Sequence, residues 1–247
     1  MQADLAIIGG TGLVKMEGLL ITEEISLDTP YGKPSSCLYR GTYADREIIF
    51  LPRHGDPPVF PPHRVNYRAN LRALKETGVK SILAINTVGG ISSAMKPCGL
   101  VIPHQIIDYT WGRDHTFFED TASPPVHVDF THPYSEPLRI QVIKAAGRAG
   151  VAVQEYGTYG ATQGPRLETA AEILRMERDG CDIVGMTGMP EAVLARELEL
   201  DYAAIALVVN HAAGKSTQLI TMDLIKENME LAYNDLRLIF NELFRLI

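Results

Sequence analysis

The sequence predicts an α/β fold in a single domain, with a mixed central β-sheet flanked by helices. Strand-length apolar runs alternate with segments of helical periodicity, which is typical of a sheet covered on both faces. Four of these runs end in short polar motifs that contain glycine, namely GGTG, NTVGG, MTGMPEA and NHAAGK. Ligands of such sheets bind beyond the carboxyl ends of the strands, so the four motifs predict one shared pocket. The four runs are residues 5–8, 82–85, 183–185 and 203–209.

The composition agrees with one globular domain over residues 1–247 and argues against several classes of partner. Hydrophobic residues make up 46% of the chain and charged residues 21%, and we find no linker, repeat or low-complexity segment. The net charge of −7, without a basic stripe, disfavours nucleic acid. The apolar runs are too short to cross a membrane, and no signal peptide is evident. Cys37, Cys98 and Cys181 lie far apart, so we expect reduced thiols and a cytoplasmic protein.

The first half of the chain predicts strands, a hairpin and one helix. The hairpin flanks a GTYAD turn, and the helix NYRANLRALKET ends before Gly78. The predicted strands are residues 5–8, 36–39, 46–51, 81–85 and 100–107, and the helix is residues 66–77.

The second half begins with a long aperiodic segment at 111–134, and a loop of this length is usually functional or part of an interface. Ser135 then caps a helix, and strands and helices alternate to the end of the chain. The last helix carries apolar residues on one face. The predicted helices are residues 135–147, 168–179, 190–198 and 222–247, and the predicted strands are residues 151–158, 183–186 and 203–209.

Several of the strand-end motifs could bind an anion. Glycines in GGTG let backbone N–H groups approach an anion, and Thr11 adds a hydroxyl, although a simple tight turn explains the motif equally well. Arg53 and His54 in LPRHG suit phosphate, the alternative being a solvated basic pair. Thr87 and Thr187, each placed after a predicted strand, could complete an anion site. The combination is harder to dismiss than any single residue.

Two further polar residues have ordinary structural explanations. Glu168 starts a predicted helix, where the helix dipole favours an acidic residue. Asn210 ends a predicted strand and could cap a turn. The sequence has no metal-ligand spacing such as HExxH, and no nucleophile motif such as GxSxG. We therefore expect no metal and no cofactor.

Taken in order, these segments resemble the purine nucleoside phosphorylase and methylthioadenosine phosphorylase family. The resemblance covers almost the whole chain, and it implies a single α/β domain, a trimer or hexamer, and cleavage of a purine nucleoside by phosphate as co-substrate. The matching segments are IIGGTGL, DTPYGKPS, RHG, VNYRAN with ALKETG, NTVGG, QGPRLET and MTGMPEAVLARE.

The resemblance also implies roles for individual residues. A neighbouring subunit is expected to help close the site through the long loop around His132, which we group with Met222 in the pocket for the 5′ group. Met186 would contact the ribose. The expected phosphate ligands are Thr11, Arg53, His54, Asn86, Thr87 and Thr187, and the expected base-pocket residues are Leu167, Glu168, Asn210 and Ala212.

The choice of purine follows from hydrogen-bond polarity. A 6-oxopurine presents an N1–H donor, which a carboxylate such as Glu168 accepts, whereas adenine presents a lone pair there. The amide of Asn210 can donate to N7 and O6. Adenine-specific relatives carry a serine where this chain has Glu168, and aspartates where it has Asn210 and Ala212. The sequence thus favours hypoxanthine or guanine.

The 5′ group follows from the start of the last helix. Relatives that bind a 5′-hydroxyl place a histidine there, but QLITMDLIKEN has none, and Met222 is the best-aligned residue, with Asp223 or Leu224 as alternatives. A methionine suits a methylthio group. The combined prediction is phosphorolysis of S-methyl-5′-thioinosine. The alternatives are methylthioadenosine or inosine/guanosine phosphorolysis, or a nucleoside-binding protein without catalysis.

Overall fold

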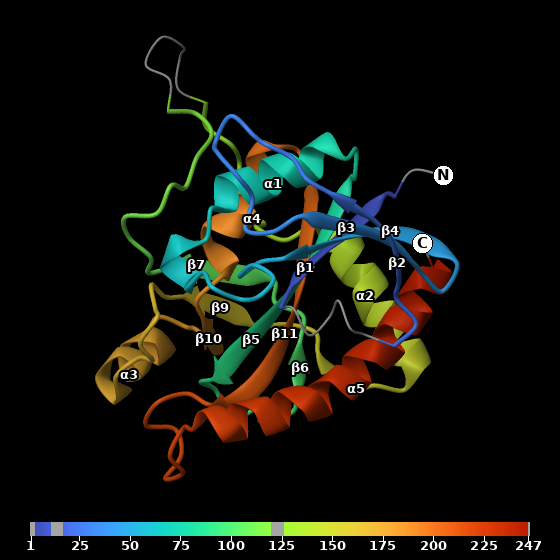
Figure 1. Ribbon diagram of the computed structural model, residues 1–247. Helices are drawn as coiled ribbons and strands as arrows, with labels where there is room; N and C mark the ends of the chain where they lie inside the picture. The colour runs from blue at the N-terminus through green and yellow to red at the C-terminus, as the bar shows by residue number, and fades with distance from the viewer. Residues whose placement is uncertain (1–2, 11–16, 120–125, 247) are drawn as a thin grey trace.

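The strands form one mixed sheet in the computed structural model, which describes residues 3–10, 17–119 and 126–246 (Figure 1). In these ranges the strands are β1 (Leu5–Gly9), β2 (Leu20–Ile25), β3 (Leu38–Tyr43), β4 (Arg46–Pro52), β5 (Ser81–Gly90), β6 (Leu100–Val101), β7 (Gln105–Asp108), β8 (Val153–Gln154), β9 (Thr158–Ala161), β10 (Ile183–Gly185) and β11 (Asp201–His211). The helices are α1 (Tyr67–Glu76), α2 (Glu136–Ala149), α3 (Ala170–Arg178), α4 (Gly188–Glu197) and α5 (Met222–Leu246).

The sheet branches at its central strand, β5. The main strand order is β2-β3-β4-β1-β5-β10-β9-β7, and β11 pairs with β5 along a second branch that continues to β6 and β8. Strand β1 pairs with β5 in parallel only as far as Ala84, and β10 takes over the same edge in antiparallel fashion at Gly89 and Gly90. Between these two pairings the edge of β5 carries no strand partner, and this is where a ligand can approach the backbone.

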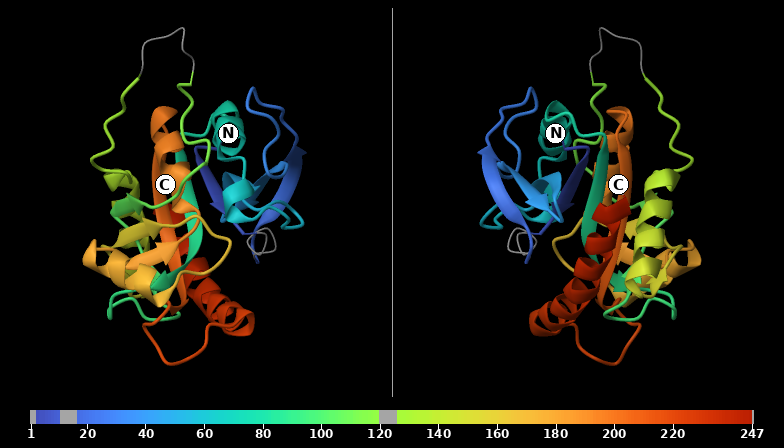
Figure 2. Two further views of the ribbon diagram at one scale, coloured as in Figure 1. Left: turned by 90° about the vertical axis from the view of Figure 1, so that its left-hand side faces the viewer. Right: turned by 90° about the vertical axis from the view of Figure 1, so that its right-hand side faces the viewer.

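Helices cover both faces of the sheet, as the strand periodicity requires. On β1, Ala6 and Ile8 pack into one buried cluster, and Leu5 and Ile7 pack into another. The first cluster includes apolar residues of α1 and α4, and the second includes those of α2 and α5. The side views show α1 and α2 on opposite sides of the central strands (Figure 2), and Figure 1 shows α4 beside α1 and α5 beside α2. The single-domain mixed α/β fold is therefore confirmed.

Two of the predicted strands are each divided in two. Residues 100–107 form β6 and β7, separated at Pro103, which cannot donate to a strand ladder. Residues 151–158 contain β8 and only the first residue of β9. The breaks coincide because β8 pairs with β6 while β9 pairs with β7, so the two pairs diverge into different branches of the sheet.

Other boundaries also differ from the sequence-based expectation. Strand β5 continues to Gly90 because β10 and β11 extend its hydrogen bonding beyond Ile85, so Asn86–Gly90 is strand and not loop. Helix α3 begins at Ala170, since Thr169 and Glu172 form its capping box, and Glu168 therefore precedes the helix. The edge strand β2 has a polar, mostly exposed sequence and was not predicted.

The helices otherwise follow the predicted pattern. Asn66 caps α1 with its side chain, which accepts a hydrogen bond from the backbone N–H of Ala69. Ser135 occupies the first cap position of α2, but its hydroxyl donates to Asp201 instead of capping the helix. The described parts of the segment between β7 and α2 contain no helix or strand, as expected, although Tyr134 in this segment is buried and Phe117 and Phe130 pack against the core.

Candidate active site

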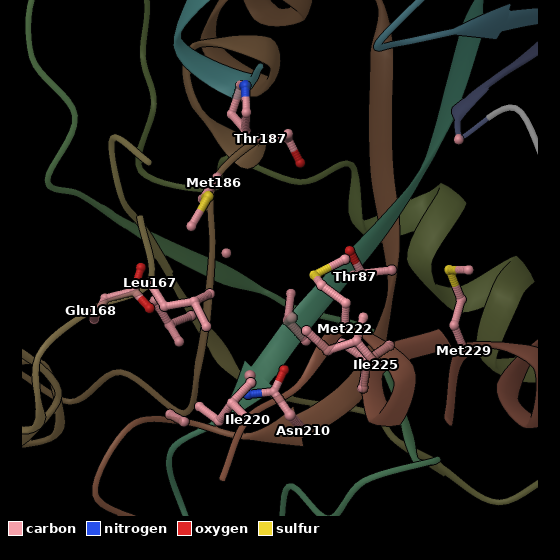
Figure 3. A pocket seen from close by; sticks show the side chains of 18 of the residues that line it. Thr87, Leu167, Glu168, Met186, Thr187, Asn210, Ile220, Met222, Ile225 and Met229 are labelled. Carbon is pink, nitrogen blue, oxygen red and sulfur yellow. The ribbon is translucent and has the colours of Figure 1, made fainter. Parts of the chain in front are cut away.

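One pocket of about 330 Å³ lies where the predicted strand ends converge. Its lining includes Gly10 after β1, Arg53 and His54 after β4, Thr87 in β5, Thr187 after β10 and Asn210 in β11. Figure 3 shows Leu167, Glu168 and Met186 on one side of this pocket, Met222, Ile225 and Met229 on the other, and Asn210 with Ile220 between them. The prediction of one shared pocket at these motifs is thus confirmed for the described residues.

The antiparallel direction of β10 explains why Thr87 and Thr187 line the same pocket. Ile183 and Val184 pair with Gly90 and Gly89, so β10 runs back along β5, and the residues that follow it reach the middle of that strand. Thr87 is the one exposed residue in the burial pattern of β5, because its side chain faces the pocket. Thr87 therefore projects from a continuous strand, not from the end of one.

A buried amide holds the hydroxyl of Thr187. The Asn86 side chain donates from Nδ2 to Thr187 Oγ1 at 2.8 Å, and Asn86 itself does not line the pocket. Beneath this segment, the Thr187 backbone N–H donates to the Tyr159 hydroxyl at 3.4 Å. A Cβ at Gly185 would lie 2.1 Å from that phenol oxygen, so only glycine fits. Asn86 is therefore better described as a support for Thr187 than as a direct ligand.

Arg53 borders the pocket but is already paired with Glu191. Its Nε and Nη2 donate to the two Glu191 carboxylate oxygens at 2.7 and 2.8 Å, and Nη1 donates to the Ile85 carbonyl at 2.9 Å. Burial opposes the charge of Arg53, but the attraction of Glu191 outweighs it, and the pKa of Arg53 lies above its ordinary value. One N–H on each terminal nitrogen remains for a ligand.

His54 carries its ring proton on Nδ1. Its Nδ1 lies 2.8 Å from the Phe60 carbonyl, which can only accept, so Nδ1 carries the hydrogen. Burial, together with the charge of Arg53, lowers the pKa of His54. The neutral ring therefore presents Nε2 as an acceptor, and it becomes a donor only on protonation.

Glu168 and Asn210 both line the pocket, as expected for a base site. Because Thr169 and Glu172 form the capping box of α3, Glu168 is not a capping residue of that helix. Its carboxylate accepts from the Thr162 hydroxyl at 2.7 Å, and it is partly exposed. The buried Asn210 amide donates to the His211 carbonyl at 2.7 Å and keeps one N–H and its carbonyl for a ligand.

The remaining wall is apolar and comes largely from α5 and the segment before it. Met222 opens α5 and lines the pocket, whereas Leu224 borders a neighbouring hollow. Leu167, Met186 and Ala212 also line the main pocket. Four residues on this wall were not predicted, because their spacing on α5 is that of a core-facing stripe or because they lie in the preceding loop. They are Ile220, Ile225, Met229 and Tyr233.

Two further predicted residues need separate mention. Thr11 lies outside the described residues. His132 borders a separate hollow with Arg196 and Tyr202, and its carbonyl accepts from Arg196 at 2.5 Å. Glu191, in contrast, borders Arg53 but was not predicted. The sequence MPEAVLARE is typical of an ordinary helix start, and nothing in its spacing indicates a buried partner for Arg53. Among the described residues, no cluster of His, Cys, Asp and Glu could hold a metal ion.

Comparisons with known proteins agree with this geometry. The profile of the phosphorylase superfamily matches residues 4–245. A probable S-methyl-5′-thioinosine phosphorylase of Pseudomonas syringae pv. tomato is 59% identical over 222 residues, which cover 90% of each chain. A probable S-methyl-5′-thioinosine phosphorylase of Xanthomonas campestris pv. campestris is 52% identical, covering 98% of this chain and 97% of that protein.

A solved structure extends the likeness to three dimensions. Methylthioadenosine phosphorylase from Schistosoma mansoni, in complex with adenine, has a TM-score of 0.93 and 33% identity, covering 99% of this chain and 91% of that one. The pocket, the ordered motifs and these relatives agree, and the chain belongs to the phosphorylase superfamily, as a member of its nucleoside phosphorylases.

Proposed function

We propose that this protein cleaves S-methyl-5′-thioinosine with inorganic phosphate, giving hypoxanthine and 5-methylthioribose 1-phosphate. The observation that carries the proposal is a single pocket with two kinds of lining. Glu168 and Asn210 line its polar part, and apolar residues of α5 line a second, apolar part. The relatives named probable S-methyl-5′-thioinosine phosphorylases support the same assignment.

The polar part suits a 6-oxopurine. Glu168 accepts one hydrogen bond from Thr162 and has further acceptor capacity for an N1–H group. Asn210 retains an N–H that can donate to N7 or O6 of the base. Adenine would turn a lone pair toward the carboxylate, and an unmatched buried polar group can reduce kcat/KM by about 10⁴-fold.

The apolar part suits a 5′-methylthio group. Ile220, Met222, Ile225 and Met229 offer hydrocarbon and thioether surface where a 5′-hydroxyl would need a polar partner. Burial of apolar surface favours the methylthio group by about 25 cal/mol per Å². We therefore propose this wall, including Met222, as the 5′ pocket.

The threonines, Arg53 and His54 are proposed to hold phosphate. Since Glu191 neutralises Arg53, much of the binding comes from hydroxyl and N–H donors. A phosphate oxygen forms the bond to C1′ as the bond from C1′ to N9 breaks, and the bonding electron pair leaves with the purine. Phosphate stabilises the positive ribosyl ring, Met186 contacts its face, and a donor from Asn210 stabilises negative charge on the base.

A substrate panel tests the proposal. Methylthioinosine, methylthioadenosine, inosine and guanosine are each incubated with and without phosphate, and free base is measured. We expect phosphate-dependent cleavage, with kcat/KM highest for methylthioinosine. A higher kcat/KM for methylthioadenosine would reject the base assignment, and binding without cleavage of any nucleoside would reject catalysis.

We also propose a homotrimer or hexamer whose neighbouring subunit helps close the pocket, with His132 contributing from that side. Leu167 and Met222 line the pocket and are 45% and 65% exposed in the single chain, so a neighbour could cover them. Sedimentation analysis tests the assembly, and a monomer with full activity would contradict it.

For location and cofactors, we propose a cytoplasmic enzyme that needs no metal. The cysteines Cys37, Cys98 and Cys181 are all free thiols, which suits a reducing compartment. Among the described residues, no helix is long and apolar enough to cross a bilayer. Full phosphorolysis in the presence of EDTA is expected, and loss of activity that zinc or magnesium restores would contradict the metal-free reaction.

A further inference from the structure

Arg113 is a buried cation whose partners are almost all backbone carbonyls. It lies in the segment between β7 and α2 and is 8% exposed. Within the part of the chain that the structure describes, Arg113 donates no hydrogen bond to a carboxylate. Its Nη1 donates to the Met186 and Met189 carbonyls at 2.8 and 2.5 Å, and its Nη2 donates to the Thr162 and Gln163 carbonyls at 3.0 and 2.8 Å. Its Nε adds a bond to Gln163 Oε1 at 3.2 Å.

These carbonyls belong to two segments that enter the pocket from different strands. Residues Thr162 and Gln163 follow β9 and lead to Glu168, whereas Met186–Met189 follows β10 and includes Thr187. The planar guanidinium therefore binds both segments at once, with one terminal nitrogen on each. A guanidinium can bind two segments at once because its N–H groups are fixed in one plane. A lysine ammonium does not have this fork geometry.

The contact continues from Arg113 to the proposed base carboxylate. Thr162 gives its carbonyl to Arg113 and donates its hydroxyl to Glu168 Oε1 at 2.7 Å. The two segments are also in direct contact, since a Cβ at Gly164 of the first segment would lie 2.5 Å from the Met186 sulfur of the second. Arg113 also lies over the Tyr67 ring, 5.6 Å from its centroid, which holds the guanidinium from the other side.

We propose that Arg113 is a positioning residue that sets the spacing between Glu168, which receives the base, and Met186, which faces the ribose. It touches neither the base nor the reacting atoms, and it acts through the Thr162 and Met186 backbones. The inference rests on the proposed function for the identity of the base. A displacement of about 1 Å in such a site can reduce the rate 10²-fold.

Arg139 offers a matched control. It is also buried, and it donates to the carbonyls of Pro103 and Ile102 at 2.9 and 3.3 Å, to that of Glu155 and, unlike Arg113, to the carboxylate of Glu136. It lies over the Tyr156 ring, 5.4 Å from its centroid, and it does not line the pocket. Replacing either arginine with lysine leaves buried carbonyls without donors, so both changes should lower the thermal midpoint.

The experiment compares Arg113→Lys, Arg139→Lys and Thr162→Val by thermal unfolding, by calorimetric titration with hypoxanthine, and by nucleoside kinetics. For Arg113→Lys we expect the Kd of hypoxanthine to rise about tenfold and kcat/KM to fall about 10²-fold. Arg139→Lys should lower the thermal midpoint without changing the Kd. Thr162→Val removes only the hydroxyl link and should weaken hypoxanthine binding in the same direction with little loss of stability.

Two results would overturn the inference. One is an unchanged Kd and kcat/KM in Arg113→Lys despite a lower thermal midpoint. The other, decisive if Arg113→Lys does not fold, is an unchanged Kd in Thr162→Val. Failure of the proposed function is separate, because it would appear in the unaltered protein as failure to cleave methylthioinosine or to bind hypoxanthine.

Discussion

The two ends of the pocket are built differently. At the proposed phosphate end, Arg53 and Glu191 are 2% and 0% exposed and form two hydrogen bonds with each other, and Asn86 fixes Thr187. At the nucleoside end, Leu167 and Met222 are 45% and 65% exposed, and Glu168 rests on a single recorded bond from Thr162.

This difference separates what substitutions should do at each end. A buried ion pair cannot lose one partner without leaving a charge uncompensated, so changes at the phosphate end should reduce the stability of the whole fold. Exposed or singly bonded side chains can change with little structural cost. The nucleoside end is therefore where specificity should be altered without unfolding the protein.

The largest effect is expected from Glu168→Ser combined with Asn210→Asp. The change removes the acceptor for N1–H and converts the amide into a group that can accept from N7–H or N6–H, so adenine becomes the better match. The ratio of kcat/KM for methylthioinosine over methylthioadenosine should fall by about 10³-fold or more. Steady-state kinetics on both nucleosides measures it.

The phosphate end supplies the control for that experiment. The KM for phosphate should stay close to its value in the unaltered protein, since neither substitution touches Thr87, Thr187 or Arg53. An unchanged ratio between the two nucleosides would show that other residues choose the base.

The second-largest effect is expected on protein stability, from a change at the proposed phosphate end. Glu191→Gln removes the charge that pairs with Arg53 and should cost about 3 kcal/mol of unfolding free energy, measured by urea denaturation. Tyr202, whose hydroxyl donates to Glu191 at 2.9 Å, keeps a partner in the glutamine. The lost charge therefore dominates the change.

The matched control is Glu172→Gln, which alters an exposed pair. Glu172 also receives two hydrogen bonds from one arginine, Arg166, but the Arg166 side chain is 67% exposed and that of Glu172 is 44% exposed. Glutamine preserves the capping box of α3, so the cost should stay below about 1 kcal/mol. Equal losses in the two variants would contradict the difference between the two ends.

The sequence was sufficient to predict the polar part of the pocket. Thr187 and Asn210 sit at or near strand ends, where backbone topology brings distant segments together, whereas Thr87 lies within β5 and Glu168 in the loop before α3. The motif order then fixed the family. Glu168 and Asn210 were assigned to the base through the family resemblance, since their local sequence is equally typical of a helix start and a turn cap.

Side-chain partners could not be predicted in the same way. Glu191 lies in a helical pattern that is equally typical of a solvent-exposed glutamate, and its pairing with Arg53 depends on how α4 packs against α1 and β11. Ile225 and Met229 fit the apolar stripe of α5, and they line the pocket while also packing at the edge of the buried cluster that α5 covers. Periodicity identifies an apolar face without saying which part of it meets a ligand.

A smaller effect is expected from Met222→His at the nucleoside end. Replacing the thioether with imidazole removes an apolar contact and adds a donor for a 5′-hydroxyl. The kcat/KM ratio of inosine over methylthioinosine should rise about tenfold, equivalent to about 1.4 kcal/mol. Thermal unfolding should be unchanged, because Met222 is largely exposed.

Leu231→His is the control on the same helix. Leu231 is also exposed but does not line the pocket, so its substitution should leave the substrate ratio unaltered. A similar rise in both variants would mean that the effect comes from α5 as a whole and not from the proposed 5′ pocket.

The smallest effect is the pH dependence of stability at His54. Burial and the charge of Arg53 lower its pKa in the folded protein, so the unfolded chain binds more protons below about pH 6.5. Stability should therefore fall as the pH decreases from about 7.5 to 5.5, and His54→Asn, which can still donate to the Phe60 carbonyl, should lose less. Urea midpoints at both pH values measure this difference. Added phosphate should reduce it, because an anion at Nε2 favours the protonated ring, and a difference that phosphate leaves intact would separate His54 from the phosphate site.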